Sequence, residues 1–253
     1  MKVAFIINDL QSMDLKKDTS IFLAKEAFDR GYEVHTFNTN NLSVQDERLF
    51  ALTSKLIFPT KDQLSFNLSN NGAEDLSEFT HVINRVNPPF NKDYLYMTLL
   101  LDAYGVPCIN PTKALREINE KLSILKFPEI IPSTRVTASL QTIKDMFNQG
   151  FETLVIKPLD GMGGRSIFLV HKDDKNLAVI WETITGRGKH LVIVQEYIPE
   201  AESGDNRIVI INGELLEQKL VRVPSPLDFR GNLAAGATSK VEKVTRSEEH
   251  TSE

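Results

Sequence analysis

The sequence contains a single cysteine, Cys108, so it can form neither an internal disulfide nor a zinc site built from cysteines. Cys108 lies in the apolar stretch 106–109, where we expect a buried structural thiol rather than a nucleophile. The five histidines are scattered without the spacing of metal ligands. This cysteine usage fits a reducing compartment, and we expect the protein in the cytoplasm.

Long runs of one chemical character are also missing. No basic run is longer than Lys16-Lys17, and the net charge is −5 with a pI near 5.6, which counts against binding to nucleic acid or to an anionic membrane. The apolar run at residues 3–7 is too short for a signal peptide or a membrane span. We therefore expect no nucleic-acid or membrane partner, and any phosphate binding must be local.

Several well-known motifs are absent: the P-loop Gly-Lys-Ser/Thr, Gly-x-Gly-x-x-Gly and His-Glu-x-x-His. Their absence counts against P-loop ATPases, dinucleotide oxidoreductases and zinc peptidases. What the chain does have is 253 residues, 41% of them hydrophobic, which suffices for the core of one to three domains.

The strongest local signal is at residues 154–170, where two short apolar runs flank a loop with Gly161, Gly163 and Gly164. Strand-length runs on either side of a glycine-rich gap predict a β-hairpin. Glycine lets the loop turn its N–H groups toward an anion, and Lys157 adds a positive charge from the preceding strand. The pattern indicates a phosphate site, but a glycine-rich surface hairpin with a solvated lysine would show the same sequence pattern.

The N-terminal pattern predicts a strand at residues 3–7, a helix capped by Asp18 or Thr19 and ended by Gly31, and a strand at residues 33–37. This order predicts a parallel sheet, in which ligands collect at the carboxyl ends of the strands. Arg85 follows the apolar strand 79–84, and two prolines then fix an extended loop. We expect Arg85 at that edge of the sheet.

Further elements follow from hydrophobic periodicity. Strands are expected at residues 49–58, 106–109, 134–137, 153–157, 166–170, 191–196 and 208–211, and helices at 92–104, 119–127, 140–149 and 177–186. Residues 67–72 are expected to form an exposed polar loop. Asn212-Gly213 predicts a type I′ turn before a returning strand at 214–223, which places Arg207 and Arg222 on neighbouring strands, where they could form an ordinary cross-strand charge ladder.

The string Lys-Pro-Leu-Asp-Gly-Met-Gly-Gly, which begins at Lys157, resembles the phosphate-covering loop of the ATP-grasp ligases, and in this spelling that of the bacterial glutathione synthetases. Asn-Glu-Lys-Leu around Lys121, Gln-Glu-Tyr-Ile from Gln195 and Arg-Gly-Asn from Arg230 look like further motifs of that family. The resemblance runs from the N-terminus to about residue 237.

The resemblance implies roles for particular residues. The expected ATP-binding residues are Lys121, Lys157, Asp160, Gly161, Met162, Gly163, Gly164, Gln195, Glu196, Tyr197, Ile198 and Asp205. The family places arginines near the transferring phosphate, so the expected catalytic residues are Arg207, Arg222 and Arg230. The expected substrate-binding residues are Arg85, Arg230, Gly231 and Asn232. Val86, Asn87 and Asn91 stand where the family has charged residues, which is a departure from its pattern.

The implied fold class is α/β. It consists of an N-terminal open parallel α/β domain at residues 1–118 and an incomplete ATP-grasp fold at residues 119–237, with a lid lobe at about 133–196. Residues 238–253 are expected to be a non-native or disordered tail.

The family holds its metal ions on strands beyond the Arg-Gly-Asn segment, with an acidic residue and a Glu-x-Asn pair, because a hard cation at ATP phosphates needs oxygen ligands. Residues 237–253 contain no such pair, so we expect no metal ligand in this chain. The last eight residues back-translate into DNA that resembles a sequencing adapter, although an unusual polar tail is the alternative. We therefore expect a C-terminally truncated, inactive fragment.

The implied reaction joins γ-glutamylcysteine and glycine with ATP and Mg²⁺ (or Mn²⁺), through an acyl phosphate. A homo-oligomer would be compatible with the full-length enzyme. Two alternatives stay open: another ATP-grasp ligase for amino acids or peptides, and a nucleotide-binding protein without catalysis.

Overall fold

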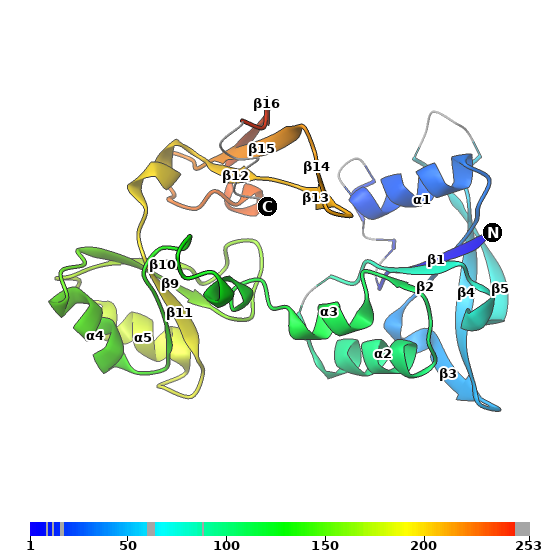
Figure 1. The fold of residues 1–253 in the computed structure, drawn as a ribbon, viewed down its shortest axis with the longest axis horizontal. Coiled ribbons are helices and arrows are strands. Elements are labelled where there is room, and N and C mark those ends of the chain that lie inside the picture. The colour runs from blue at the N-terminus through cyan, green and yellow to red at the C-terminus, as the bar shows by residue number, and fades with distance from the viewer. Residues whose placement is uncertain (9, 12, 16–17, 60–63, 88, 246–253) are drawn as a thin grey trace. The chain divides into compact units, whose positions relative to one another are not determined.

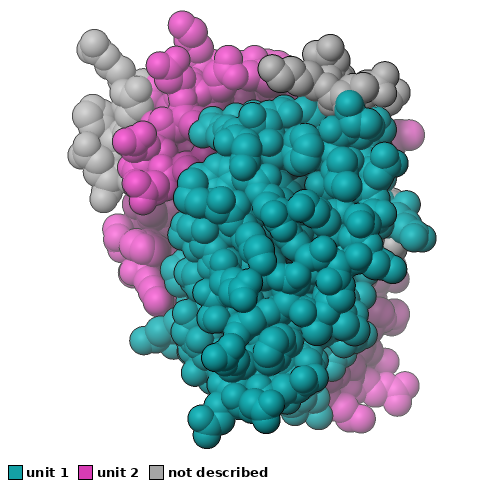
Figure 2. Space-filling model, turned by 90° about the vertical axis from the view of Figure 1, so that its right-hand side faces the viewer, with its two compact units in different colours: residues 1–120 teal, residues 121–253 magenta. Residues whose placement is uncertain are grey.

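A computed structural model describes the chain except residues 9, 12, 16–17, 60–63, 88 and 246–253. It divides into two compact units, residues 1–120 and 121–253, which Figure 2 shows in different colours. The sequence pattern placed this division between residues 118 and 119. No helix among the described residues is long and apolar enough to cross a membrane.

The first unit is built on a parallel sheet. Strand β1 (Lys2–Ile6) pairs in parallel with β2 (Glu33–Phe37) on one side and with β6 (His81–Asn84) on the other, and β6 pairs in parallel with β7 (Cys108–Ile109). Helix α1 (Thr19–Asp29) connects β1 to β2, and the side chain of Asp18 caps its N-terminus. The predicted parallel arrangement is confirmed (Figure 1).

The other side of this sheet is antiparallel. It contains β3 (Leu42–Gln45), β4 (Arg48–Ile57) and β5 (Asn67–Asp75), and β5 pairs with β4 along most of its length. The prediction of a loop at residues 67–72 is therefore wrong. Most of β5 is exposed, and because a backbone ladder needs no apolar side chains, its polar sequence carries no strand signal.

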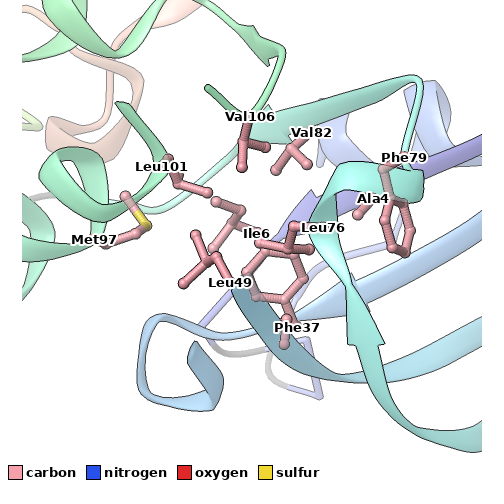
Figure 3. Packing of buried hydrophobic residues seen from close by; sticks show 11 residues of the cluster. Ala4, Ile6, Phe37, Leu49, Leu76, Phe79, Val82, Met97, Leu101 and Val106 are labelled. Carbon is pink, nitrogen blue, oxygen red and sulfur yellow. The ribbon is translucent and has the colours of Figure 1, made fainter. Parts of the chain in front are cut away.

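Helices cover both faces of the first sheet. Helix α2 (Lys92–Ala103) packs Met97 and Leu101 against Ile6 and Val82 of the sheet in the cluster shown in Figure 3, and α3 (Thr112–Glu117) follows it. Helix α1 packs Ile21 with a second buried cluster, which includes side chains of β1 and β2. Three-residue 3₁₀ turns lie at η1 (Thr39–Asn41) and η2 (Leu76–Glu78).

The second unit begins with η3 (Ser123–Lys126), a 3₁₀ turn, where the pattern predicted a helix over residues 119–127. That prediction is wrong. Helix α3 already ends at Glu117, Ile118 is extended, and the intervening residues are not helical. Lys121 instead donates hydrogen bonds to the carbonyl oxygens of Leu159 and Gly161, so this segment is held by long-range contacts rather than by helical ones.

Next comes an antiparallel sheet in the order β10-β9-β11-β8. Its strands are β8 (Thr134–Thr137), β9 (Thr153–Pro158), β10 (Phe168–His171) and β11 (Val192–Glu196), and its helices are α4 (Leu140–Asn148) and α5 (Leu177–Thr185). Both helices pack on Leu154 and Ile156 of β9 and on Val192 and Val194 of β11. The opposite face of β9 and β11 is not covered by these helices, and it lines a cavity.

The remaining strands form two small sheets. Strands β12 (Asp205–Arg207), β15 (Gln218–Val223) and β16 (Thr238–Lys243) make one, and β13 (Ile210–Ile211) and β14 (Glu214–Leu215) make the other. Asn212 and Gly213 have φ of 53° and 82° between β13 and β14, as the predicted type I′ turn requires. The 3₁₀ turns η4 (Pro199–Ser203) and η5 (Leu233–Ala235) lie in the linking segments.

Strand β16 differs from the expected tail. Residues 238–243 pair with the whole of β15, so this part is ordered, and its backbone ladder compensates for mostly exposed side chains. Residues 246–253, the rest of the expected tail, lie outside the described residues.

Candidate functional site

The open face of β9 and β11 lines a cavity of about 210 Å³ in the second unit. Because side chains alternate along a strand, Leu154 and Ile156 point to the helices while Val155 and Lys157 point to the cavity. Predicted site residues in the lining are Lys157, Gln195, Glu196, Tyr197, Ile198, Asp205, Arg230, Gly231 and Asn232. Residues far apart in the sequence thus meet in one cavity.

The cavity also has lining residues that the sequence reasoning missed: Pro132, Val155, Ile167, Ala201 and Phe229. They supply apolar surface beside the polar groups, as small-molecule sites usually do. Phe229 could have been found because it adjoins Arg230, whereas the others carry no signal apart from the strand pattern.

Lys157 is a half-buried cation of this cavity. Its Nζ donates a hydrogen bond to Oε1 of Gln195 at 2.8 Å. Burial lowers the pKa of Lys157, and the positive charge of Lys121 lowers it further. Lys121 Nζ lies 3.0 Å from the carbonyl oxygen of Gly161, so a second lysine fixes the start of the glycine loop. A negatively charged ligand would relieve the repulsion between the two ammonium groups.

The loop between β9 and β10 is a hairpin loop, as predicted, and it approaches the Arg-Gly-Asn segment closely. Gly163 and Gly164 have φ of +66° and +77°, a region that favours glycine. A Cβ on Gly164 would lie 2.6 Å from Oδ1 of Asn232, so any side chain there would push Asn232 out of its place. Asp160 and Met162 are exposed and do not line the cavity.

Asp205 and Arg222 are register partners on β12 and β15, and Arg222 Nε donates to Asp205 Oδ1 at 2.6 Å. A Cβ on Gly231 would collide with the other carboxylate oxygen of Asp205, which explains the glycine. Arg207 lies at the far end of β12, is exposed and does not line the cavity. The structure thus brings Arg222 close to the cavity through Asp205 but leaves Arg207 outside its lining.

Arg230 joins two loops. Its Nη1 donates to the carbonyl oxygen of Gly164 at 2.7 Å, and its Nε lies 2.9 Å and 3.0 Å from the two carboxylate oxygens of Asp228. The hydrogen bonds between these two side chains lower the pKa of Asp228 to about 2 and raise the pKa of Arg230. Asp228 was missed in the sequence, although an aspartate that accepts from the N–H two residues later is a recognisable turn.

Arg85 lies in the first unit, at the carboxyl end of β6. Its Nε donates to Ser20 Oγ at 2.8 Å, and it lines a separate cavity of about 340 Å³. Four of the other lining residues are asparagines, Asn8, Asn40, Asn87 and Asn91, and one is an aspartate, Asp93. Charged and amide groups at this edge suit a small polar ligand.

The residues of the first-described cavity fit a nucleotide. Lys157 supplies charge, and Val155, Ile167 and Phe229 supply apolar surface for a ring. Gly161, Gly163 and Gly164 do not line the cavity, but Gly164 lies against its lining residue Asn232. The described residues do not form a comparable site for a metal ion. Nowhere among them do three histidine, cysteine or acidic side chains lie close enough together to hold one. We assign no metal ligand to this part of the chain.

Comparison with solved structures supports the fold. D-cycloserine synthetase DcsG matches with a TM-score of 0.64 at 11% identity, covering 100% of this chain and 78% of that one. A RimK domain ATP-grasp protein from Sphaerobacter thermophilus matches with a TM-score of 0.56 at 19% identity, covering 88% and 73%. The predicted α/β architecture with an ATP-grasp fold is confirmed.

Comparison with known sequences supports the family. Glutathione synthetase of Vibrio parahaemolyticus is 34% identical over 251 residues, covering 98% of this chain and 79% of the relative. That of Vibrio cholerae is 37% identical over 241 residues, covering 93% and 75%. Residues 1–116 match the prokaryotic glutathione synthetase N-terminal domain, and residues 120–253 match the prokaryotic glutathione synthetase ATP-grasp domain. The chain therefore belongs to the prokaryotic glutathione synthetase family.

Proposed function

We propose that the protein makes glutathione by joining γ-glutamylcysteine to glycine with ATP. Family membership supports the reaction, and one observation of the structure supports the site. The half-buried cation Lys157, the segment 195–198 and the Arg-Gly-Asn segment line a single cavity. This is the arrangement that a nucleotide donating its terminal phosphate to a carboxylate requires.

The reaction proceeds in two balanced steps. A carboxylate oxygen of γ-glutamylcysteine attacks the γ-phosphorus of ATP, and the bond to ADP breaks. The amine of glycine then attacks the acyl carbon, an amide bond forms, and phosphate leaves with the former carboxylate oxygen while the amine loses a proton. Most of the catalytic work is positioning and neutralisation of charge.

The predicted site residues, both those that line the cavity and those outside its lining, each have a role in this proposal. Lys157 and Lys121 hold the phosphates, and the glycine loop covers them with backbone N–H groups. Backbone groups of residues 195–198 meet the adenine edge, with Asp205 nearby. Arg222 and Arg207 balance the charge of the transferring phosphate, and Arg230, Gly231 and Asn232 hold the peptide substrate.

Arg85 is proposed to bind a substrate carboxylate in the first unit. A guanidinium forms paired hydrogen bonds with a carboxylate, and the amide groups in the same cavity can complete its contacts.

The family requires ATP and a divalent metal, and we propose Mg²⁺, with Mn²⁺ as a substitute. The metal would balance the charge of the ATP phosphates. We also propose a cytoplasmic location, supported by the single cysteine, and a homo-oligomer for the full-length enzyme.

Product analysis tests the proposed reaction. The protein is incubated with ATP, Mg²⁺, γ-glutamylcysteine and glycine, and the products are identified by mass spectrometry. The alignment covers 79% of the Vibrio parahaemolyticus relative. The assay therefore includes a second version of the protein, extended with the residues of that relative that lie outside the alignment. We expect glutathione from the extended version, with one ADP per peptide, and inactivity of the 253-residue chain stays a prediction.

Two other outcomes would change the assignment. Another amide product from other amino acids would indicate a different ATP-grasp ligase. If both versions bind ATP and neither of them forms a product, the protein would be a nucleotide-binding protein without catalysis.

A further inference from the structure

A series of hydrogen bonds runs from Lys157 through the cavity residue Gln195 and the first residue of β8 to the carbonyl oxygen of Pro132, which also lines the cavity. Lys157 Nζ donates to Gln195 Oε1 at 2.8 Å, and Gln195 Nε2 donates to Thr134 Oγ1 at 3.0 Å. The Thr134 hydroxyl in turn donates to the carbonyl oxygen of Pro132 at 2.6 Å. Thr134 and Gln195 are register partners of β8 and β11, but Thr134 does not line the cavity.

The direction of each of these hydrogen bonds follows from the bond between Thr134 and Pro132. A hydroxyl has one hydrogen, and that of Thr134 is used on Pro132, so Thr134 Oγ1 can only accept from Gln195. The amide of Gln195 must then turn its NH₂ toward Thr134 and its oxygen toward Lys157. The reversed amide would place two donors, NH₂ and ammonium, against each other in a site where only 6% of Gln195 is exposed.

We propose that Thr134 is a positioning residue for nucleotide binding, which orients the amide of Gln195 and through it holds the ammonium of Lys157 in the cavity. The inference rests on the proposed ATP site and adds a residue outside it. Without the hydroxyl, the NH₂ of Gln195 loses its buried acceptor, and the amide that accepts from Lys157 is no longer held from its other end.

Calorimetric titration with ATP, without the other substrates, tests the proposal. Thr134→Val removes the hydroxyl at nearly constant volume and is expected to raise the Kd for ATP about 3- to 10-fold. Thr134→Ser keeps the hydroxyl and is expected to stay within about twofold of the unmodified chain. Thr137→Val, the same change on the same strand, is the matched control and is expected to leave the Kd within about twofold.

A double-mutant cycle separates positioning from general loosening of the sheet. If Thr134 acts through Lys157, then Thr134→Val has no further effect on the Kd in a Lys157→Met background. Should Thr134→Val not fold, Thr134→Ala removes the same hydroxyl and takes its place in the cycle.

The outcomes are distinct. An unchanged Kd in Thr134→Val, an equal loss in Thr134→Ser, or the same loss in the Lys157→Met background overturns the proposal while leaving the ATP site intact. Failure of the unmodified chain to bind ATP overturns the proposed ATP site and, with it, this inference.

Discussion

At the scale of single residues, Lys157 carries the largest part of the proposed function. An ammonium group removed from water destabilises the charged form, which the lowered pKa of Lys157 reflects. Lys121 adds repulsion instead of relieving it. Such a residue contributes little to folding, so its presence in the cavity is best explained by an anionic ligand that pairs with it.

Replacement of Lys157 tests this explanation. Lys157→Ala is expected to weaken ATP binding about 10- to 100-fold, because a desolvated charge-assisted contact is worth about 1.5–3 kcal/mol. Lys175→Ala, at an exposed lysine outside the cavity lining, serves as the control. Calorimetry gives both affinities, and an unchanged affinity in Lys157→Ala would exclude contact with the phosphates.

Asp228 and Arg230 give a prediction about pH. The pKa of Asp228 is lowered from 3.8 to about 2, so the ion pair contributes fully to stability above about pH 4, and this contribution is lost as the pH falls through 2. ¹³C NMR of the Asp228 carboxyl group is expected to show a midpoint near 2. In Arg230→Gln the midpoint is expected to return toward 3.8, and an unshifted midpoint in the unmodified chain would contradict the pair.

Arg230 is also expected to separate peptide binding from ATP binding. Arg230→Lys keeps the positive charge but loses the planar fork that holds a carboxylate. We expect a higher KM for γ-glutamylcysteine with a nearly unchanged affinity for ATP, measured in the extended version. A selective loss of ATP affinity would instead assign Arg230 to the phosphate side.

At the scale of elements, the glycine loop between β9 and β10 acts through its backbone. Gly163 has φ of +66°, and the nearest atom to an added Cβ is 3.6 Å away on Ala234, so strain of the backbone rather than lack of space excludes other residues. The loop is therefore held in a conformation that L side chains rarely adopt.

Gly163→Val is expected to impair turnover of the extended version much more than the thermal stability. A β-branched residue resists positive φ, while an irregular loop contributes little to the core. Gly72→Val makes the same change at φ of +84° in the other unit and is the matched control, with turnover expected to stay near normal. Normal rates in Gly163→Val, or loss of folding, would contradict this account of the loop.

Elements also show where prediction from the sequence succeeds and fails. The apolar strands β1 and β9 and the turn at Asn212-Gly213 were predicted because periodicity and turn chemistry are local properties. Strand β5 was missed because its polar residues are exposed, and the segment around Lys121 was wrongly predicted as helical because its contacts lie 40 residues away. The cavity residues Pro132 and Ile167 could not be predicted, since only tertiary packing brings them together.

At the scale of the whole molecule, the proposed reaction activates the carboxylate of γ-glutamylcysteine by phosphorylation. Transfer of an oxygen atom tests this most directly. The extended version is incubated with ATP, Mg²⁺, glycine and γ-glutamylcysteine whose reacting carboxylate carries ¹⁸O at both oxygens. We predict that the released phosphate contains one ¹⁸O atom and that the new amide carbonyl retains the other. Glutathione formed without ¹⁸O in the phosphate would contradict the acyl phosphate and the role proposed for the cavity.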